Sequence, residues 1–502
     1  MLKSERKFHS PNEEIGQDAP PEHPLFEGQS LKELSAKHND FGKKLYNLIW
    51  NNPTRLITFS FVLVILVGAL LLMLPIASRS GESTPFLTTL FTATSATCVT
   101  GLIFVDTMTY WSFFGQVVIL LLIQIGGLSL LTLLSAFSLR LHRQVKITTT
   151  MALQDSTAGA GIPDTLALVK KVVKITFTAE FIGAVLLIWR FSKYMPWQRA
   201  IWKGFFQAIS AFCNAGFDLM GDVSGPFTSL TAFNGDPFIL LVTGSLIVSG
   251  GLGFIVWDEL LHLHKRKKLS FHSKLVLRMT ALLLIIGAIV FYFLPGSTVD
   301  GVKPVSSLPF GERLNAAVFQ SVTLRTAGFN SIDQASLPDF AKVFSSLWML
   351  IGAAPASTGG GIKVTSFALA AVGFMADLRK KGDDIHLMNH QLRQDLVKRS
   401  FVLFFFGIMW TLILSLILSL NLTPALEKEV RFTDLLFEAT SAFGTVGVSS
   451  IGSGRLSTLS HLFLILTMYI GRVGPASFAV SFFTQKPVAQ HQVLPEAKTV
   501  VG

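Results

Sequence analysis

Residues 91–102 read FTATSATCVTGL, and similar stretches recur at 206–217 (FQAISAFCNAGF), 319–329 (FQSVTLRTAGF) and 437–448 (FEATSAFGTVGV). Each copy begins with Phe and ends in a turn whose last glycine serves to align the copies. Aligned on that glycine, the copies lie 115, 112 and 119 residues apart, and the third is one residue shorter between its Phe and its glycine. A near-constant period predicts four copies of one structural unit in a single chain.

Each copy lies between two long apolar segments, and the chain has eight of these: roughly 55–75, 113–137, 167–189, 238–257, 275–294, 341–376, 401–420 and 460–483. A membrane-spanning helix needs about 20 mostly apolar residues, whereas buried helices of soluble proteins rarely run so far without a charge. We therefore predict an all-α integral membrane protein with four tandem helix–pore-loop–helix repeats. Its eight spans and four re-entrant pore helices would surround one central pore in a pseudo-fourfold arrangement.

The repeats set the predicted domain boundaries. Repeats one to four cover 51–150, 151–265, 266–395 and 396–485, between an N-terminal segment at 1–50 and a tail at 486–502. The first 50 residues are polar and lack the apolar core of a cleavable signal peptide. Within them, the segment 30–50 has leucines at helical spacing, which suits either an interfacial helix on the inner leaflet or a solvated linker helix.

Composition supports a membrane protein. Half of the 502 residues are apolar, only 15% are charged, and the mean hydropathy is +0.53. These values exclude a disordered chain, and two cysteines exclude a disulfide scaffold. The net charge of +11 could indicate a nucleic-acid partner. The basic excess lies in the N-terminus, the inter-repeat loops and the C-terminus, so the positive-inside rule predicts that both termini are cytoplasmic and that no nucleic acid is bound.

The four glycine turns suit a cation pathway. Glycine tolerates positive φ and lets the backbone approach a ligand, and irregular backbone at membrane depth is tolerated only where protein buries it or a cavity receives it. Carbonyl groups from converging loops can replace the water shell of a cation. The alternative is four packing glycines in structural re-entrant loops. A second glycine follows each turn: Gly126, Gly250, Gly352 and Gly471.

The stretches SATCVTGL, SAFCNAGF, VTLRTAGFNSID, IGAAPASTGGGIKVTSF, SAFGTVGV and IGRVGPASF resemble the Trk/Ktr/HKT superfamily of potassium transporters over residues 50–485. Within it the chain looks most like the Ktr membrane subunit (KtrB), because the polar first 50 residues leave no room for the extra helix pair of the Trk branch. Plant HKT sodium uniporters carry Ser at the first turn glycine. The four glycines here thus imply potassium selectivity, with uptake promoted by sodium.

The resemblance implies that the four glycine turns form the selectivity filter for potassium. Arg325 stands in the third turn, where a cation beside the path would repel potassium, so we expect its side chain to point away and bind a carboxylate or carbonyl groups. The implied filter residues are Thr97, Cys98, Val99, Thr100, Gly101, Cys213, Asn214, Ala215, Gly216, Arg325, Thr326, Ala327, Gly328, Gly444, Thr445, Val446 and Gly447.

The sixth span is predicted to break. Residues 352–362, GAAPASTGGGI, contain five glycines and a proline, which no helix accommodates comfortably. The resemblance implies an intramembrane gating loop here, formed around Gly359, Gly360, Gly361 and Lys363, with a passive kink as the alternative. Arg472 in the last span could reach the loop carbonyls and hold the gate shut, or could serve packing alone. Glu180 is either a structural partner of a basic group or part of ion handling.

No nucleotide-binding motif is present, since GGGIKVTS lacks the Walker A spacing. A transporter driven by ATP would therefore need another subunit. The chain is not expected to be an enzyme, because no Asp/His/Glu or Ser/His cluster recurs within the spans, and K⁺, with Na⁺ possible, is the expected transported ion. The resemblance implies a homodimer and a cytoplasmic ring of nucleotide-binding, KtrA-like regulatory subunits. The first competing prediction is a Na⁺-coupled K⁺ carrier with alternating access. The second, less favoured one is a membrane protein without transport activity.

Overall fold

The structure is a computed structural model, and it describes residues 53–128, 162–223, 225–294, 305–379, 385–422, 426, 429–475, 477 and 478. The predicted helix at 30–50, the C-terminal tail and the ends of the second and eighth spans lie outside these residues. The described part is helical apart from short turns and one small hairpin, formed by β1 (His386–Leu387) and β2 (His390–Gln391). The predicted all-helical class is confirmed.

The helices follow the predicted order of long helix, shorter helix, turn and third helix, four times along the chain. The first set is α2 (Pro53–Leu72), α3 (Phe86–Thr97) and α5 (Phe113–Leu128), with α4 (Thr107–Tyr110) between the last two. The second set is α8 (Ile162–Phe191), α9 (Trp197–Phe212) and α10 (Pro237–Gly251), followed by α11 (Phe254–Leu261) and α12 (Leu263–Arg266). The third set is α13 (Phe271–Tyr292), α14 (Phe310–Thr323), α15 (Asp339–Leu350) and α16 (Val364–Leu378), and the fourth is α17 (Gln394–Leu420), α19 (Phe432–Gly444) and α20 (Thr458–Val473).

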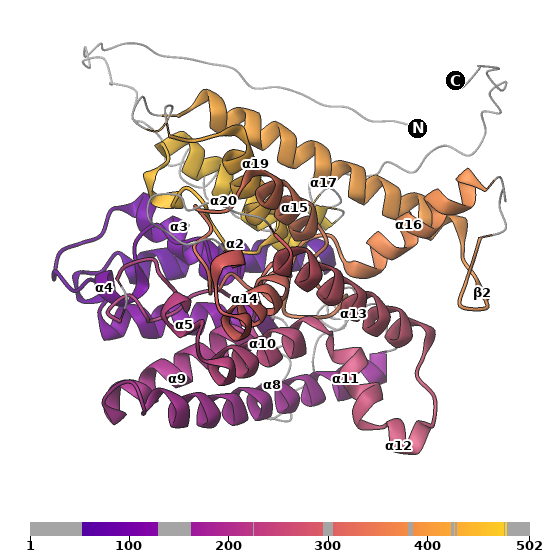
Figure 1. Ribbon diagram of the computed structural model, residues 1–502, viewed down its shortest axis with the longest axis horizontal. Helices are drawn as coiled ribbons and strands as arrows, with labels where there is room; N and C mark the ends of the chain where they lie inside the picture. The colour runs from indigo at the N-terminus through magenta and orange to yellow at the C-terminus, as the bar shows by residue number, and fades with distance from the viewer. Residues whose placement is uncertain are drawn as a thin grey trace, which may run out of the picture. The chain divides into compact units, whose positions relative to one another are not determined.

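The four sets contact one another in a cycle. Within each set the long helix packs on the shorter one, as α2 on α3 and α8 on α9. Between sets, the third helix packs on the shorter helix of the next set: α5 on α9, α10 on α14 and α15 on α19. The cycle closes because α20 packs on α3. Figure 1 shows α14 between the long helices α8 and α17, which run along opposite edges of the helical assembly.

Four described helices are long and apolar enough to cross a membrane, namely Arg55–Leu72, Val169–Phe191, Phe271–Tyr292 and Gln394–Leu420. Each is the first helix of its set and exposes large apolar side chains such as Leu63, Phe181 and Leu416. Exposure of this kind suits a helix that faces lipid. The helices α5, α16 and α20 are apolar but shorter.

The fourth span departs from its prediction. We expected one continuous helix over 238–257, but α10 ends at Gly251 and α11 leaves it at an angle of 102°. Gly253 has a φ of 87°, and a Cβ atom there would lie 2.6 Å from the carbonyl oxygen of Pro355. The carbonyl of Gly251 accepts a hydrogen bond from the amide of Ala354, at 3.0 Å. The helix therefore ends because its last carbonyls bind the broken part of the sixth span.

Candidate ion pathway

The four turns share one backbone conformation. Two residues before each turn glycine the chain is left-handed, with φ between 49° and 64°, and the glycine itself has φ between 72° and 97°. A left-handed non-glycine residue costs about 1–3 kcal/mol and persists only where its surroundings impose it. Repetition in four places indicates that this strain serves the site. The left-handed residues are Val99, Asn214, Thr326 and Thr445.

The turn glycines Gly101, Gly216, Gly328 and Gly447 form a closed ring. A Cβ atom on Gly101 would lie 3.0 Å from the Cα of Gly216, and one on Gly216 would lie 2.8 Å from the Cα of Gly328. A Cβ on Gly328 would lie 3.4 Å from the Cα of Gly447, and one on Gly447 would lie 2.8 Å from the Cα of Gly101. Because each glycine abuts the next at backbone distance, the ring has no room for side chains.

The turns present carbonyl groups that are free to bind a cation. Within the described residues, none of the carbonyls from the two positions before each glycine accepts a hydrogen bond. Buried carbonyl groups normally find a partner, so eight unused ones around one ring suit a ligand that the chain itself does not supply. They belong to Val99, Thr100, Asn214, Ala215, Thr326, Ala327, Thr445 and Val446.

Four hydroxyl groups brace the turns, and our sequence reasoning missed them. Ser95 and Ser441 accept hydrogen bonds from the amides of Gly101 and Gly447, at 3.1 and 3.0 Å. In the other two repeats the hydroxyl donates to the carbonyl just after the glycine, from Ser210 to Phe217 at 2.6 Å and from Thr323 to Phe329 at 2.7 Å. The signal was present, because every copy has Ser or Thr four residues after its first Phe.

The second glycines lie behind the turns. Side chains at Gly126, Gly250 and Gly471 would collide with the carbonyls of Thr97, Phe212 and Phe443, respectively. Each of these carbonyls lies four residues before a turn glycine, so the missing side chain lets the third helix pack against the end of the shorter one. The fourth member differs: a side chain at Gly352 would meet the carbonyl of Gly360.

The sixth span breaks where the sequence predicts. Helix α15 ends at Leu350 and α16 begins at Val364, and we call residues 351–363 between them the gate loop, after the role that the sequence predicts for them. This loop lies directly against the turns, because a side chain on Gly359 would collide with the hydroxyl of Thr326, and one on Gly360 with that of Thr445. Both threonines are left-handed turn residues, so the loop fills the space beside the ring.

Arg472 fastens the gate loop. Its guanidinium donates hydrogen bonds to the carbonyls of Thr358 in the loop and Gly126 in α5, and it lies 3.4 Å from that of Gly127. Lys363 donates to the carbonyl of Gly359 at 2.8 Å. The predicted reach of Arg472 to the loop carbonyls is thus present, and the side chain ties the loop to a helix of the first repeat.

Arg325 does not find the partner we expected. Its side chain is buried, with 7% exposed, but Nε has no hydrogen-bond partner among the described residues. The groups around it include the apolar side chains of Ile247, Leu284 and Val322. Within the described residues Nε therefore has neither the carboxylate nor the carbonyl that we expected, and the small cavity that Arg325 lines is mainly aliphatic.

Glu180 lies behind the second turn and bonds neutral groups. Gln124 donates to its carboxylate at 3.1 Å, and the thiol of Cys213 lies 3.7 Å away. No basic side chain contacts this carboxylate within the described ranges, so the structural-partner alternative is not supported there. Cys98 and Cys213 are both buried, and neither forms a disulfide.

The carboxylates that follow the turns are held by local bonds. Asp106 accepts from the amide of Thr109 at 2.8 Å, Asp218 from that of Met220 at 2.9 Å, and Asp333 from that of Ser336 at 3.1 Å. Asp222 forms an ion pair with Lys203. Burial raises the pKa of the Asp218 carboxyl to about 6, and the nearby charge of Asp106 acts in the same direction.

Comparison with known proteins decides the family. The family of TrkH cation transport proteins matches residues 32–492. This chain belongs to the TrkH family. Its similarity to the potassium/sodium uptake protein NtpJ of Enterococcus hirae is 36% identity, over 90% of this chain and 97% of NtpJ. The Ktr system potassium uptake protein B of Bacillus subtilis is 35% identical, over 86% of this chain and 93% of its own.

The fold of the TrkH family is also seen in a solved relative. The potassium transporter TrkH from Vibrio parahaemolyticus superposes with a TM-score of 0.63 at 16% identity, over 85% of this chain and 84% of that one. The resemblance found in the sequence motifs is confirmed, and so is the expectation that the chain is a membrane cation transporter rather than an enzyme.

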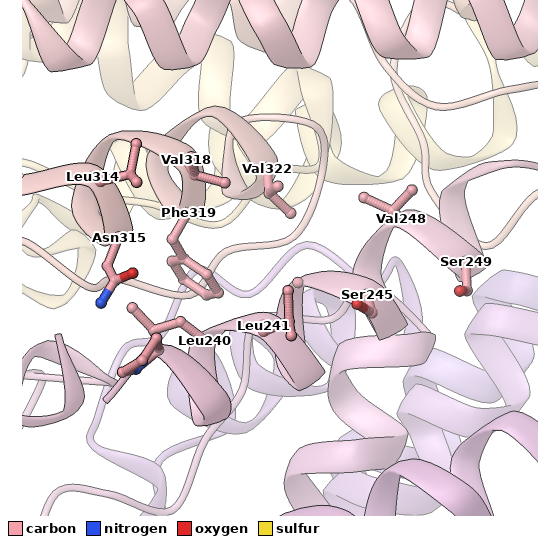
Figure 2. A pocket seen from close by; sticks show the side chains of 12 residues that line it. Leu240, Leu241, Ser245, Val248, Ser249, Leu314, Asn315, Val318, Phe319 and Val322 are labelled. Carbon is pink, nitrogen blue, oxygen red and sulfur yellow. The ribbon is translucent and has the colours of Figure 1, made fainter. Parts of the chain in front are cut away.

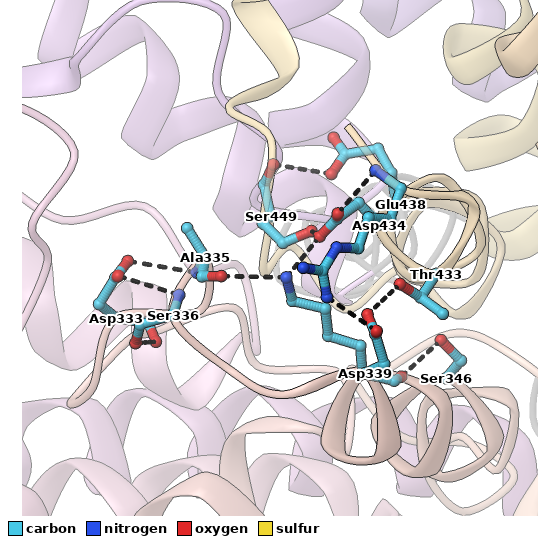
Figure 3. Close-up of polar contacts among 12 residues, drawn as sticks. Asp333, Ala335, Ser336, Asp339, Ser346, Thr433, Asp434, Glu438 and Ser449 are labelled. Atoms are coloured by element: carbon cyan, nitrogen blue, oxygen red, sulfur yellow. Dashed lines mark hydrogen bonds and ion pairs between the residues drawn. The ribbon is translucent and has the colours of Figure 1, made fainter. Parts of the chain in front are cut away.

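A polar cluster joins the third and fourth repeats of this TrkH-family chain, on α15 and α19 (Figure 3). Lys342 and Asp434 form an ion pair of 2.7 Å, and each side chain is only 8% exposed. Lys342 also donates to the carbonyl of Ala335 at 3.0 Å. On the exposed rim, Arg431 pairs with Asp339 at 2.8 Å.

Replacing Asp434 with Asn is expected to destabilise the protein by about 3–5 kcal/mol, because it leaves the buried Lys342 charge without its counter-ion. The apparent melting temperature in detergent measures this effect. Asp395→Asn is the matched control, since the Arg393–Asp395 pair is 78% and 69% exposed and such pairs contribute about 0–1 kcal/mol. Equal melting temperatures for the two variants would contradict the prediction.

Proposed function

We propose that this protein is the potassium-translocating membrane subunit of a Ktr-type uptake system. The observation that carries the proposal is the closed ring of Gly101, Gly216, Gly328 and Gly447 with its unused carbonyls. The choice of ion is supported by relatives that are named as potassium uptake proteins and that match this chain over most of their length. In the finer proposal, eight spans and four pore helices surround this ring in pseudo-fourfold order, and both termini are cytoplasmic.

The ring would select potassium by backbone chemistry. Carbonyl oxygens replace the hydration shell of the ion, and α3, α9, α14 and α19 end just before the turns. Helix C-termini carry partial negative charge, which favours a cation there. The bracing hydroxyls hold the turns in place while the ion occupies them.

The gate loop and Arg472 would control passage. The loop fills the space beside Thr326 and Thr445, and Arg472 places a positive charge at the loop. A cytoplasmic ring of nucleotide-binding subunits would move the loop, and the membrane subunit would act as a homodimer. Sodium would promote uptake, in keeping with the name of NtpJ.

Growth at low potassium tests the proposal. The full chain, expressed with a KtrA-like subunit in cells that lack their own potassium uptake systems, should restore growth and rubidium uptake. Normal membrane expression without either would refute it. A Na⁺-coupled carrier is the second candidate, because α10–α11 and α15–α16 are broken as in many carriers. Potassium accumulation that follows the sodium gradient, at fixed membrane potential, would favour the carrier.

Uptake should fall as external pH drops through about 6. We propose that the segments after the turn glycines, including Asp218, face the outside, since both termini are proposed to be cytoplasmic. Asp218, with its raised pKa, is charged above that pH and attracts cations there; below it the carboxyl is neutral. Asp218→Asn should give low uptake that no longer changes between pH 7.5 and 5.5. Rubidium uptake over that range, with Asp333→Asn as the control, measures the effect. An unchanged pH profile in Asp218→Asn would contradict the assignment.

A further inference from the structure

A cavity of about 540 Å³ lies between the second and third repeats, against α10 and α14. Figure 2 shows Leu314 and Asn315 at one end of it, Val248 and Ser249 at the other, and the ring of Phe319 between the two helices. Its lining is mainly aliphatic and aromatic. The amide nitrogen of Asn315 is already used, because it donates to the carbonyl of Asn234 at 3.2 Å.

The cavity opens toward the apolar outer surface. Leu241 is 68% exposed, Leu314 45% and Val318 46%, and all three line it. Gly244 keeps the middle of the cavity wide, because a Cβ atom there would find nothing closer than 3.8 Å. In a membrane this opening faces hydrocarbon, so an apolar chain can enter from the side.

The inner end of the cavity leads to a buried cation. A second, much smaller cavity of about 10 Å³ shares Val248 and Val322 with the first and is lined by Arg325. Arg325 lines this space, its Nε has no hydrogen-bond partner in the described ranges, and its side chain is 7% exposed. An unpaired buried charge is costly, so this end favours an anionic group.

We propose that the cavity binds one long-chain fatty acid, with its hydrocarbon chain between α10 and α14 and its carboxylate on Arg325. A single-chain carboxylate is chosen over a phospholipid because it is the smaller anionic lipid, and the inner cavity of about 10 Å³ must widen least to admit it. Rotation of the Val248 or Val322 side chain would join the two cavities and let the carboxylate reach the guanidinium, which binds carboxylates in a two-pronged geometry.

The bound carboxylate would also affect transport, a consequence that rests on the proposed function. Arg325 directly precedes Thr326, the left-handed residue of the third turn. Its positive charge lowers cation occupancy of the ring, and a carboxylate on Arg325 cancels that charge. Fatty acid should therefore raise potassium uptake at least twofold.

Native mass spectrometry of the purified full-length protein tests binding without transport, with oleate and its uncharged analogue oleyl alcohol as probes. The wild type should bind oleate at least tenfold more tightly than oleyl alcohol. Arg325→Gln should remove that preference, and Arg325→Lys, which keeps the charge, should retain part of it. Gly244→Leu should fill the cavity and lose both probes. Gly311→Leu is the matched control, because Gly311 lies on α14 with nothing within 4 Å and outside the cavity.

Several results would overturn the fatty-acid site. They are equal binding of the two probes by the wild type, an oleate preference that survives in both Arg325→Gln and Gly244→Leu, retention of phospholipid in place of oleate, and Leu241 cross-linking to a second copy that covers the cavity. Rubidium uptake into liposomes separates the two proposals. Oleate binding without stimulated uptake refutes the regulatory consequence alone, whereas absence of all uptake counts against the proposed function and leaves the binding result standing.

Discussion

Gly216→Ala is expected to lower rubidium uptake at least tenfold and to abolish discrimination between potassium and sodium. The added methyl group would lie 2.8 Å from the Cα of Gly328 and 2.9 Å from the carbonyl oxygen of Ala327. Both partners are backbone atoms that cannot rotate away. Alanine also disfavours the φ of 72° found at this position. The substitution therefore forces the second and third turns apart and disturbs the spacing of the carbonyls.

Gly311→Ala is the matched control for this variant. Gly311 lies in the first turn of α14, where an added Cβ meets nothing within 4 Å. The same chemical change should leave uptake and selectivity as they are. The measurement is uptake of radioactive rubidium and sodium in cells that lack other potassium uptake systems, normalised to protein in the membrane. Normal selectivity in Gly216→Ala would refute the glycine ring as the filter.

Arg472→Ala should raise basal potassium uptake several-fold in the absence of the regulatory subunit. The variant removes the hydrogen bonds that tie the gate loop at Thr358 to Gly126 in α5. It also removes a positive charge that opposes a cation near the ring. A freed loop spends more time away from Thr326 and Thr445, so the path is open more often. Deletion of Gly359–Gly361 should act in the same direction.

Arg472→Lys separates charge from geometry. Lysine keeps the charge but cannot bridge two carbonyls with a planar fork, so uptake should fall between those of the wild type and Arg472→Ala. Arg455→Ala serves as the control, since Arg455 is 56% exposed and pairs with Glu429 at the surface. Uptake at or below the wild-type rate in Arg472→Ala, with normal expression, would show that Arg472 does not hold the gate shut.

Much of this arrangement was predictable from the repeat. The four glycine turns, the shorter helices before them and the broken sixth span lie where the sequence places them, because glycine and proline act on the local backbone. The bend at Gly253 was missed because its cause is distant: the gate loop binds the end of α10. The bracing hydroxyls were missed because we aligned the copies on their glycines, and the shorter third copy puts Thr323 out of step with Ser95.

The surroundings of Arg325 could not be predicted. The sequence places a cation next to the third turn, and general electrostatics favours an acidic or carbonyl partner for it. Which side chains surround it depends on how α10 meets α14, a contact between repeats that no local pattern encodes. In the structure Ile247, Leu284 and Val322 lie there instead of an acidic or carbonyl partner. This difference is the basis of the fatty-acid site proposed above.

The closed cycle of helix contacts has a consequence for biosynthesis. Helix α20 packs on α3, and the hydroxyl of Tyr469 donates to the carbonyl of Thr58 in α2 at 2.8 Å. The first repeat therefore acquires its final neighbour only after the last one has left the ribosome. Until then, the face of repeat one that later packs on α20 has no partner from repeat four. A chain truncated in repeat four would leave the α20-binding face of repeat one exposed. Quality-control proteases could recognise that exposed face as a sign of an incomplete protein.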